Sequence, residues 1–143
     1  MKKQRSEALV GATMAYNLLA KRTIFAARGG LTKEQTLVVN SLGQSGPIWM
    51  SELSGRLAIP KEQASRAVSA LEERGLVARS PVEGNRRAVA VSLTDAGHAF
   101  LDKSHTEIDL LFEDNLAKLT EDEIAELSQA AETSARLLVK ALC

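Results

Sequence analysis

The sequence contains a single cysteine, Cys143, so no disulfide can form within one chain. A chain without an internal disulfide framework fits a reducing compartment, and we expect a cytoplasmic protein. Long apolar runs are missing too, because none approaches the ~20 residues that a membrane helix needs. The basic, mildly apolar N-terminus is interrupted by Glu7, Asn17 and Lys21, so we expect neither a secretion signal nor a membrane partner.

Motifs for catalysis and for metal binding are also missing. The sequence has no glycine-rich phosphate loop, and none of its serines lies in a nucleophile motif. His98 and His105 share one predicted helix, but no cysteine or carboxylate cluster completes a metal site around them. We therefore expect no catalytic residue, no metal and no cofactor, and a protein that is not an enzyme.

The net charge is zero, but the charges are sorted along the chain. Residues 1–30 carry six basic and one acidic residue, residues 56–87 carry seven basic and four acidic, and residues 101–143 carry four basic and ten acidic. This sorting allows one part of the molecule to meet a polyanion while another faces water. On charge alone, solvated surfaces explain the pattern better.

The most informative stretch is residues 51–94, which predicts two short helices and then two strands. In the second helix, Lys61–Arg74, the apolar residues recur at helical spacing and form one stripe: Ala64, Ala67, Val68 and Leu71. Short polar and basic side chains occupy the rest of this helix, and such side chains contact base edges and phosphates in a major groove. The strands, residues 76–79 and 88–92, are joined by a loop that ends in two arginines. The pattern predicts a winged helix-turn-helix.

Helices precede this stretch. The first is predicted from about Arg5 to Ala27 and is ended by the glycine pair at 29–30. Thr32 and Gln35 form a capping box for the second, which the glycines and proline at 43–47 should end. Trp49 is expected in the loop before a third helix that Ser51 opens.

Two long helices follow it. One is capped by Thr94 or Asp95 and continues to about Ala117, and a second capping box, Thr120 with Glu123, opens the last. This final helix carries a heptad-like seam that needs a partner helix: Ile124, Leu127, Ala131, Ser134 and Leu138. We predict a mainly α fold with a small β wing, in which long N- and C-terminal helices serve dimerisation. We expect a single domain, 1–143, with a DNA-binding lobe at 31–94 and a dimerisation lobe formed by 1–28 and 95–143.

Short stretches in a fixed order also carry a resemblance: Leu31-Thr32 with Gln35, Glu52-Leu53 with Arg56-Leu57, Ser65-Arg66, Leu71-Glu72, Arg74-Gly75-Leu76-Val77, Arg86-Arg87-Ala88 and Ser92-Leu93-Thr94 with Gly97. Together they resemble the multiple-antibiotic-resistance regulator (MarR) family of bacterial transcription factors. The resemblance covers nearly the whole chain. Each stretch alone is weak, whereas the ordered set is specific.

The resemblance implies a homodimer whose first and last helices interlock. It implies binding to a pseudo-palindromic operator in double-stranded DNA, usually as a repressor, and release when a small aromatic or phenolic ligand binds. Family members that sense oxidants carry a reactive cysteine in the first helix, where this chain has none, so peroxide sensing by that route is not expected. The chain departs from the family at Asn85, where an Asp usually orients the arginine that corresponds to Arg87.

Candidate DNA-binding residues follow from the predicted helix and wing. We expect Gln63, Ser65 and Arg66 at base edges or nearby phosphates, and Lys61 and Ser69 at phosphates. Arg86 and Arg87 should reach the DNA backbone or the minor groove, because a narrow groove attracts arginine. As an alternative, Arg66 pairs with an acidic neighbour, Glu62 or Glu73, on a solvated face.

Two other functions remain open from the sequence. The first is a winged-helix protein–protein adaptor that has lost DNA binding, which the neutral net charge and Asn85 favour slightly and the arginines disfavour. The second is a small enzyme, which the missing catalytic motifs disfavour. A ligand cleft is expected between the wing-bearing lobe and the long helices, with no residue assigned to it.

Overall fold

A computed structural model describes residues 1–143. Its elements follow in the order α1 (Lys2–Arg22), α2 (Lys33–Ser45), β1 (Ile48–Trp49), α3 (Met50–Leu57), α4 (Lys61–Glu73), β2 (Val77–Val82), β3 (Asn85–Leu93), α5 (Asp95–Asn115) and α6 (Glu121–Leu142). The mainly α architecture with a small β wing confirms the predicted fold class. None of the helices combines the length and hydropathy needed to cross a bilayer.

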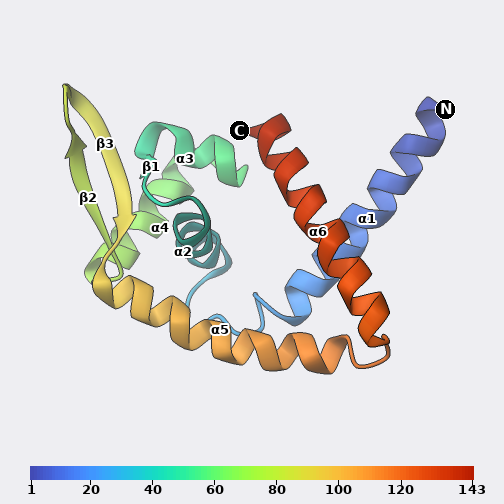
Figure 1. The fold of residues 1–143 in the computed structure, drawn as a ribbon. Helices are drawn as coiled ribbons and strands as arrows, with labels where there is room; N and C mark the ends of the chain where they lie inside the picture. Colours follow the sequence, from blue (N-terminus) through green and yellow to red (C-terminus); the bar gives the residue numbers. More distant parts are fainter.

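Helix α5 connects two parts of the molecule (Figure 1). At one end of α5 lie the sheet and the short helices α2, α3 and α4, and at the other end lie α1 and α6. The sheet is antiparallel, in the order β1-β3-β2. The wing is the β2–β3 hairpin, which projects beyond α4.

The hydrophobic core lies at the wing end of the molecule. Helix α2 packs against α4, and α3 packs against both α4 and β3. The core cluster joins these elements to the start of α5 through Leu101. Its fully enclosed members include Val38 of α2, Leu53 of α3 and Val91 of β3, each 0% exposed. Helices α1 and α6, in contrast, contain no buried residue.

The first helix ends earlier than the sequence indicated. It was predicted to continue to Ala27 but ends at Arg22. The hydroxyl of Thr23 donates to the carbonyl of Leu19 at 2.7 Å, so the side chain takes the acceptor that the next helical amide would have used. The glycine pair at 29–30 therefore does not end the helix but lies in the linker to α2.

The loop predicted at residues 80–87 is in fact mostly strand. β2 continues to Val82 and β3 begins at Asn85, which leaves a two-residue turn between them. Gly84 in this turn has φ +77°, a conformation that suits a tight hairpin. Pro81 is tolerated because β2 is the edge strand. Both wing arginines therefore extend from a strand rather than from a loop.

A third strand was missed. Trp49, expected in a loop, belongs to β1, and Ile48 and Trp49 pair with Val91 and Ala90 of β3. Two residues are too few to show an alternating pattern, and only the pairing with a distant strand defines them. Ile48 is buried, whereas Trp49 remains 42% exposed.

The predicted helix starts were more accurate than the ends. Both capping boxes, Thr32 with Gln35 and Thr120 with Glu123, are formed, and Thr94 is the cap of α5. Helix α2 continues through Gly43 to Ser45 and is capped by Gly46, so the second of the predicted glycines ends it. A Cβ at position 43 would lie 2.6 Å from a methyl group of Leu101, so this glycine provides room for α5.

At Gly97, helix α5 lies very close to the base of the wing, which is formed by Leu76 before β2 and Leu93 at the end of β3. A Cβ at this position would lie 2.0 Å from the carbonyl oxygen of Leu76, and the amide of Gly97 donates to the capping hydroxyl of Thr94. The same hydroxyl donates to the carbonyl of Gly75. The start of α5 is therefore held directly against the segment that joins α4 to β2.

We predict that Gly97→Ala lowers the free energy of unfolding by about 1–3 kcal/mol, the usual cost of overpacking a close-packed site. Chemical denaturation of the two proteins measures the difference. Gly55→Ala in α3 is the matched control, because no atom lies within 4 Å of the added Cβ. The control should be neutral or slightly more stable, and an equal loss in both variants would contradict the contact.

Candidate nucleic-acid interface

One face of α4 is buried and the other is exposed. The four apolar residues predicted for the core, Ala64, Ala67, Val68 and Leu71, are all buried. Because α2 and α3 cover this stripe, the opposite face of α4 is directed to solvent. The predicted contact residues on α4 are all exposed: Lys61, Gln63, Ser65, Arg66 and Ser69.

The exposed face of α4, which we call the reading face, is shallowly hollowed and polar. Lys61, Glu62, Ser65, Arg66 and Ser69 line the hollow, with no apolar side chain among them. Glu62 lies in the first turn of the helix, where a negative charge is favoured by the helix dipole. The reading face thus offers cations, hydroxyls and one carboxylate between Lys61 and Ser69 of one helix.

Arg66 forms neither of the ion pairs considered as alternatives. Its Nε donates to the backbone carbonyl of Glu62 at 3.4 Å, one turn back along the helix. The ion pair that the protein contains joins Arg79 and Glu72, and it involves neither Arg66 nor Glu73. The remaining guanidinium donors of Arg66 are therefore free for a ligand.

The wing brings Arg86 and Arg87 to the surface near the start of β3, and both are exposed. The pairing between β2 and β3 is irregular here, because Val82 pairs with Asn85 but Pro81 pairs with Val89. The side-chain oxygen of Asn85 accepts a hydrogen bond from the backbone amide of Arg87 at 3.2 Å. Asn85 therefore holds the main chain at Arg87 and leaves the guanidinium without a fixed charged partner.

Arg79 of β2 is a residue to which sequence reasoning gave no role. It extends back to α4 and contacts the edge of the reading face. The sequence predicted that Arg79 lies in a strand, but it did not show that the side chain contacts α4. No group of three histidine, cysteine or acidic side chains lies close enough to hold a metal ion.

This arrangement fits the chemistry of a DNA duplex. A helix with exposed hydroxyl, amide and guanidinium groups can enter a major groove, and a two-stranded wing with terminal arginines can reach an adjacent groove or the backbone. Four of the exposed side chains are cationic: Lys61, Arg66, Arg86 and Arg87.

Comparison with known proteins agrees with this geometry. Residues 31–89 match the model of the MarR family. The chain is 30% identical over 118 residues to the HTH-type transcriptional repressor MdtR of Bacillus subtilis, and the match covers 78% of this chain and 76% of MdtR. MdtR therefore matches both the winged segment and part of the surrounding helices.

Solved structures share the fold. The apo form of MarR from E. coli superimposes with a TM-score of 0.70 at 23% identity, covering 85% of this chain and 95% of MarR. NadR in complex with 4-hydroxyphenylacetate gives a TM-score of 0.68 at 20% identity, covering 88% and 90% of the two chains. These structures agree on the fold, and the family model and the repressor match identify the protein as a member of the MarR family of transcriptional regulators.

Proposed function

We propose that this protein is a homodimeric repressor that binds a pseudo-palindromic operator and releases it when a small aromatic or phenolic ligand binds. The observation that carries the proposal is the two-sided α4, whose apolar stripe is buried while its polar face is fully presented. In this proposal residues 31–94 form the DNA-binding lobe. Residues 1–28 and 95–143 form the dimerisation lobe of the same domain.

The contacts are divided between specificity and affinity. Gln63, Ser65 and Arg66 lie on the reading face and contact base edges or the nearest phosphates. Lys61 and Ser69 contact phosphates. Arg86 and Arg87, at the exposed end of the wing, contact the backbone or the minor groove. Backbone contacts supply affinity for any sequence, whereas base contacts distinguish one sequence from another.

Dimerisation is supported by the apolar side chains that α1 and α6 leave in solvent. Leu9, Val10 and Met14 of α1 are 61–64% exposed, and Leu137 and Leu138 of α6 are each 50% exposed. A patch of this kind marks an interaction surface. The heptad-like seam of α6 adds the spacing expected for packing against another helix.

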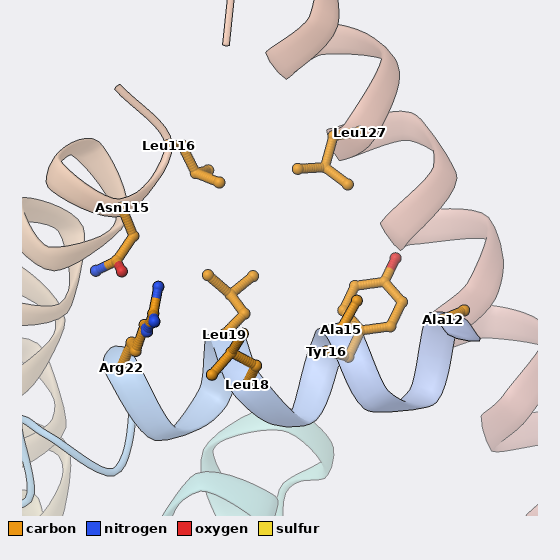
Figure 2. A pocket seen from close by; sticks show the side chains of 9 residues that line it. All are labelled: Ala12, Ala15, Tyr16, Leu18, Leu19, Arg22, Asn115, Leu116 and Leu127. Carbon is orange, nitrogen blue, oxygen red and sulfur yellow. The ribbon is translucent and has the colours of Figure 1, made fainter. Parts of the chain in front are cut away.

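An open apolar hollow of about 400 Å³ lies within the same region, between α1, the end of α5 and α6 (Figure 2). Tyr16 and Leu19 of α1, Leu116 just after α5 and Leu127 of α6 point into it. Seven of its nine lining residues are hydrophobic. Side chains of a second copy would fill this space and remove it from water.

A ligand site is supported by a second hollow of about 480 Å³. Phe25 and Leu37 give it apolar walls, Asn40 and Gln44 provide amides, and Arg56 is its one charged side chain. This lining suits a small ring with a polar or anionic substituent. The structural similarity to NadR, which was solved with 4-hydroxyphenylacetate, adds support for that chemical class.

Removing the wing arginine tests DNA binding. We predict that Arg87→Ala weakens binding to a selected operator and to random duplex by the same factor. The slope of log affinity against log salt should fall by about 1, since one phosphate contact is lost. Titrations at several salt concentrations measure both. Lys118→Ala, which removes an exposed charge from the distant α5–α6 turn, should change neither.

The same titrations separate the competing functions. A protein–protein adaptor would show almost no binding to random duplex at low salt. Gln63→Ala provides the contrast within the reading face, because losing a base contact should change the sequence recovered in a selection more than it changes baseline affinity. Recovery of an unchanged operator with Gln63→Ala would count against base reading by this residue.

Dimerisation is tested by charged substitutions on the terminal helices. We predict that Leu9→Glu combined with Leu138→Glu yields monomers at micromolar concentration, because both side chains are half exposed or more in the single chain and would be buried in the dimer. Sedimentation velocity measures the mass. Trp49→Glu is the control, since Trp49 is 42% exposed but lies on β1, the edge strand opposite β2 and far from the terminal helices. A wild-type protein that remains monomeric would exclude the proposed assembly.

Ligand release is tested with 4-hydroxyphenylacetate as the probe. We predict that the compound lowers the fraction of operator bound by wild-type protein, and that Leu37→Trp, which fills the hollow beside α2, abolishes this response while DNA binding without the compound is retained. Fluorescence anisotropy of labelled operator measures both quantities. An undiminished response in Leu37→Trp would show that the ligand binds elsewhere.

A further inference from the structure

Arg79 forms the protein's one ion pair, and that pair lies beside the reading face. From β2 its guanidinium reaches back to α4 and pairs with the carboxylate of Glu72. The same group donates to the backbone carbonyl of Ser65 at 3.4 Å and to the hydroxyl oxygen of Ser69 at 3.3 Å. One side chain at the wing base therefore bridges two turns of α4.

The geometry needs an arginine. A guanidinium has five N–H donors in a rigid, planar fork, so it can serve three acceptors in fixed relative positions. A lysine carries a similar charge on a flexible stem and cannot reproduce that fork. Arg79 pairs with Val91 in the strand register, so the bridge begins at a position already fixed by the sheet.

The charge of Arg79 is already compensated. Its pairing with Glu72 neutralises a carboxylate that would otherwise repel phosphate at the end of the reading face. The side chains are 29% and 34% exposed, so the pair is partly shielded from water. A compensated cation displaces few counterions from DNA, and this distinguishes Arg79 from the free wing arginines.

The hydrogen bond from Arg79 also orients the hydroxyl group of Ser69. Because its oxygen accepts from a cationic donor, its own O–H is left to donate outward, toward an acceptor such as a phosphate oxygen. Ser65 is held through its backbone carbonyl, which fixes the main chain where a base-contacting side chain begins. Both predicted DNA contacts are therefore oriented by one residue that does not itself need to touch DNA.

We propose that Arg79 is a positioning residue for sequence recognition, which locks the wing to α4 and orients Ser65 and Ser69 on the reading face. This role rests on the proposed function, since it concerns the same DNA interface. Through Ser65, which is placed at base edges, it gives a side chain outside α4 a part in discrimination between sequences. Through Ser69, a phosphate contact, the same side chain has a smaller part in general affinity.

The test begins with an operator selected by the wild-type protein from a random duplex library. Arg79→Met keeps an unbranched apolar stem but removes the guanidinium and its donors. We expect its affinity for the selected operator to fall about tenfold, as for the loss of one specific contact. Because Arg79→Met also leaves the Glu72 carboxylate without its partner, the comparison on random duplex uses Arg79→Met combined with Glu72→Gln. Affinity of this combined variant for random duplex should change less than about twofold, and its salt slope on random duplex should remain that of wild type.

Two further variants keep the test decisive if Arg79→Met folds poorly, which thermal unfolding would reveal. Arg79→Lys retains the charge and should still lose most of the discrimination. Ser69→Ala completes a double-mutant cycle with Arg79→Lys, and the two effects on operator affinity should be clearly less than additive, because the residues act as one unit. Arg86→Met on the wing is the control, and it should lower both affinities together and reduce the salt slope.

Several results would overturn the proposal. If Arg79→Lys binds the operator as wild type does, charge alone is sufficient and positioning fails. If Arg79→Met combined with Glu72→Gln lowers both affinities equally and reduces the salt slope, Arg79 is a phosphate contact. If the wild-type protein selects no operator at all, the proposed function itself fails, and this outcome is recognised before any variant is made.

Discussion

The burial of one stripe of α4 is the interaction on which the rest of the structure depends. Val68 and Leu71 are 0% exposed beneath α2 and α3, and a helix fixed on one side must present its other side to solvent. The same core continues through Leu53 and Ile48 to Val91 of β3. The orientation of the reading face and that of the wing are therefore consequences of one packed cluster, and neither is set by its own polar residues.

A second constraint connects this cluster to the terminal helices. The ring of Phe100 in α5 lies against the linker between α1 and α2, where a Cβ on Gly29 would approach it to 2.8 Å. The guanidinium of Arg74, at the end of α4, lies 5.7 Å from the centre of the same ring. A change in the direction of α1 relative to α2 would thus act on a ring that also contacts the end of the reading helix.

Sequence patterns were reliable where a local rule decides the structure. The stripe of α4 and the capping boxes at Thr32 and Thr120 follow from helical spacing and from hydrogen bonds within four residues, and all are formed. The features that the sequence did not predict depend on contacts between segments far apart in the chain. β1 exists only because β3 pairs with it, and the bridge from Arg79 joins β2 to a helix that precedes it in the chain. The DNA contacts themselves stay predictions, because exposure of a side chain does not show what it binds.

The absence of buried residues in α1 and α6 has a further consequence for the proposed function. A single chain fixes where its reading face points, but the distance between two reading faces depends on contacts that the chain does not contain. Two half-sites one helical turn apart, ~34 Å, are read together only if that distance is right. The hollow lined by Phe25, Leu37 and Val139 is bounded by α1, α2 and α6. A ligand there would contact both the terminal helices, which set the distance between the two reading faces, and the DNA-binding lobe. It can change DNA affinity only by binding one spacing more tightly than another. Regulation would then require no contact between ligand and DNA, and no change within the core that holds α4.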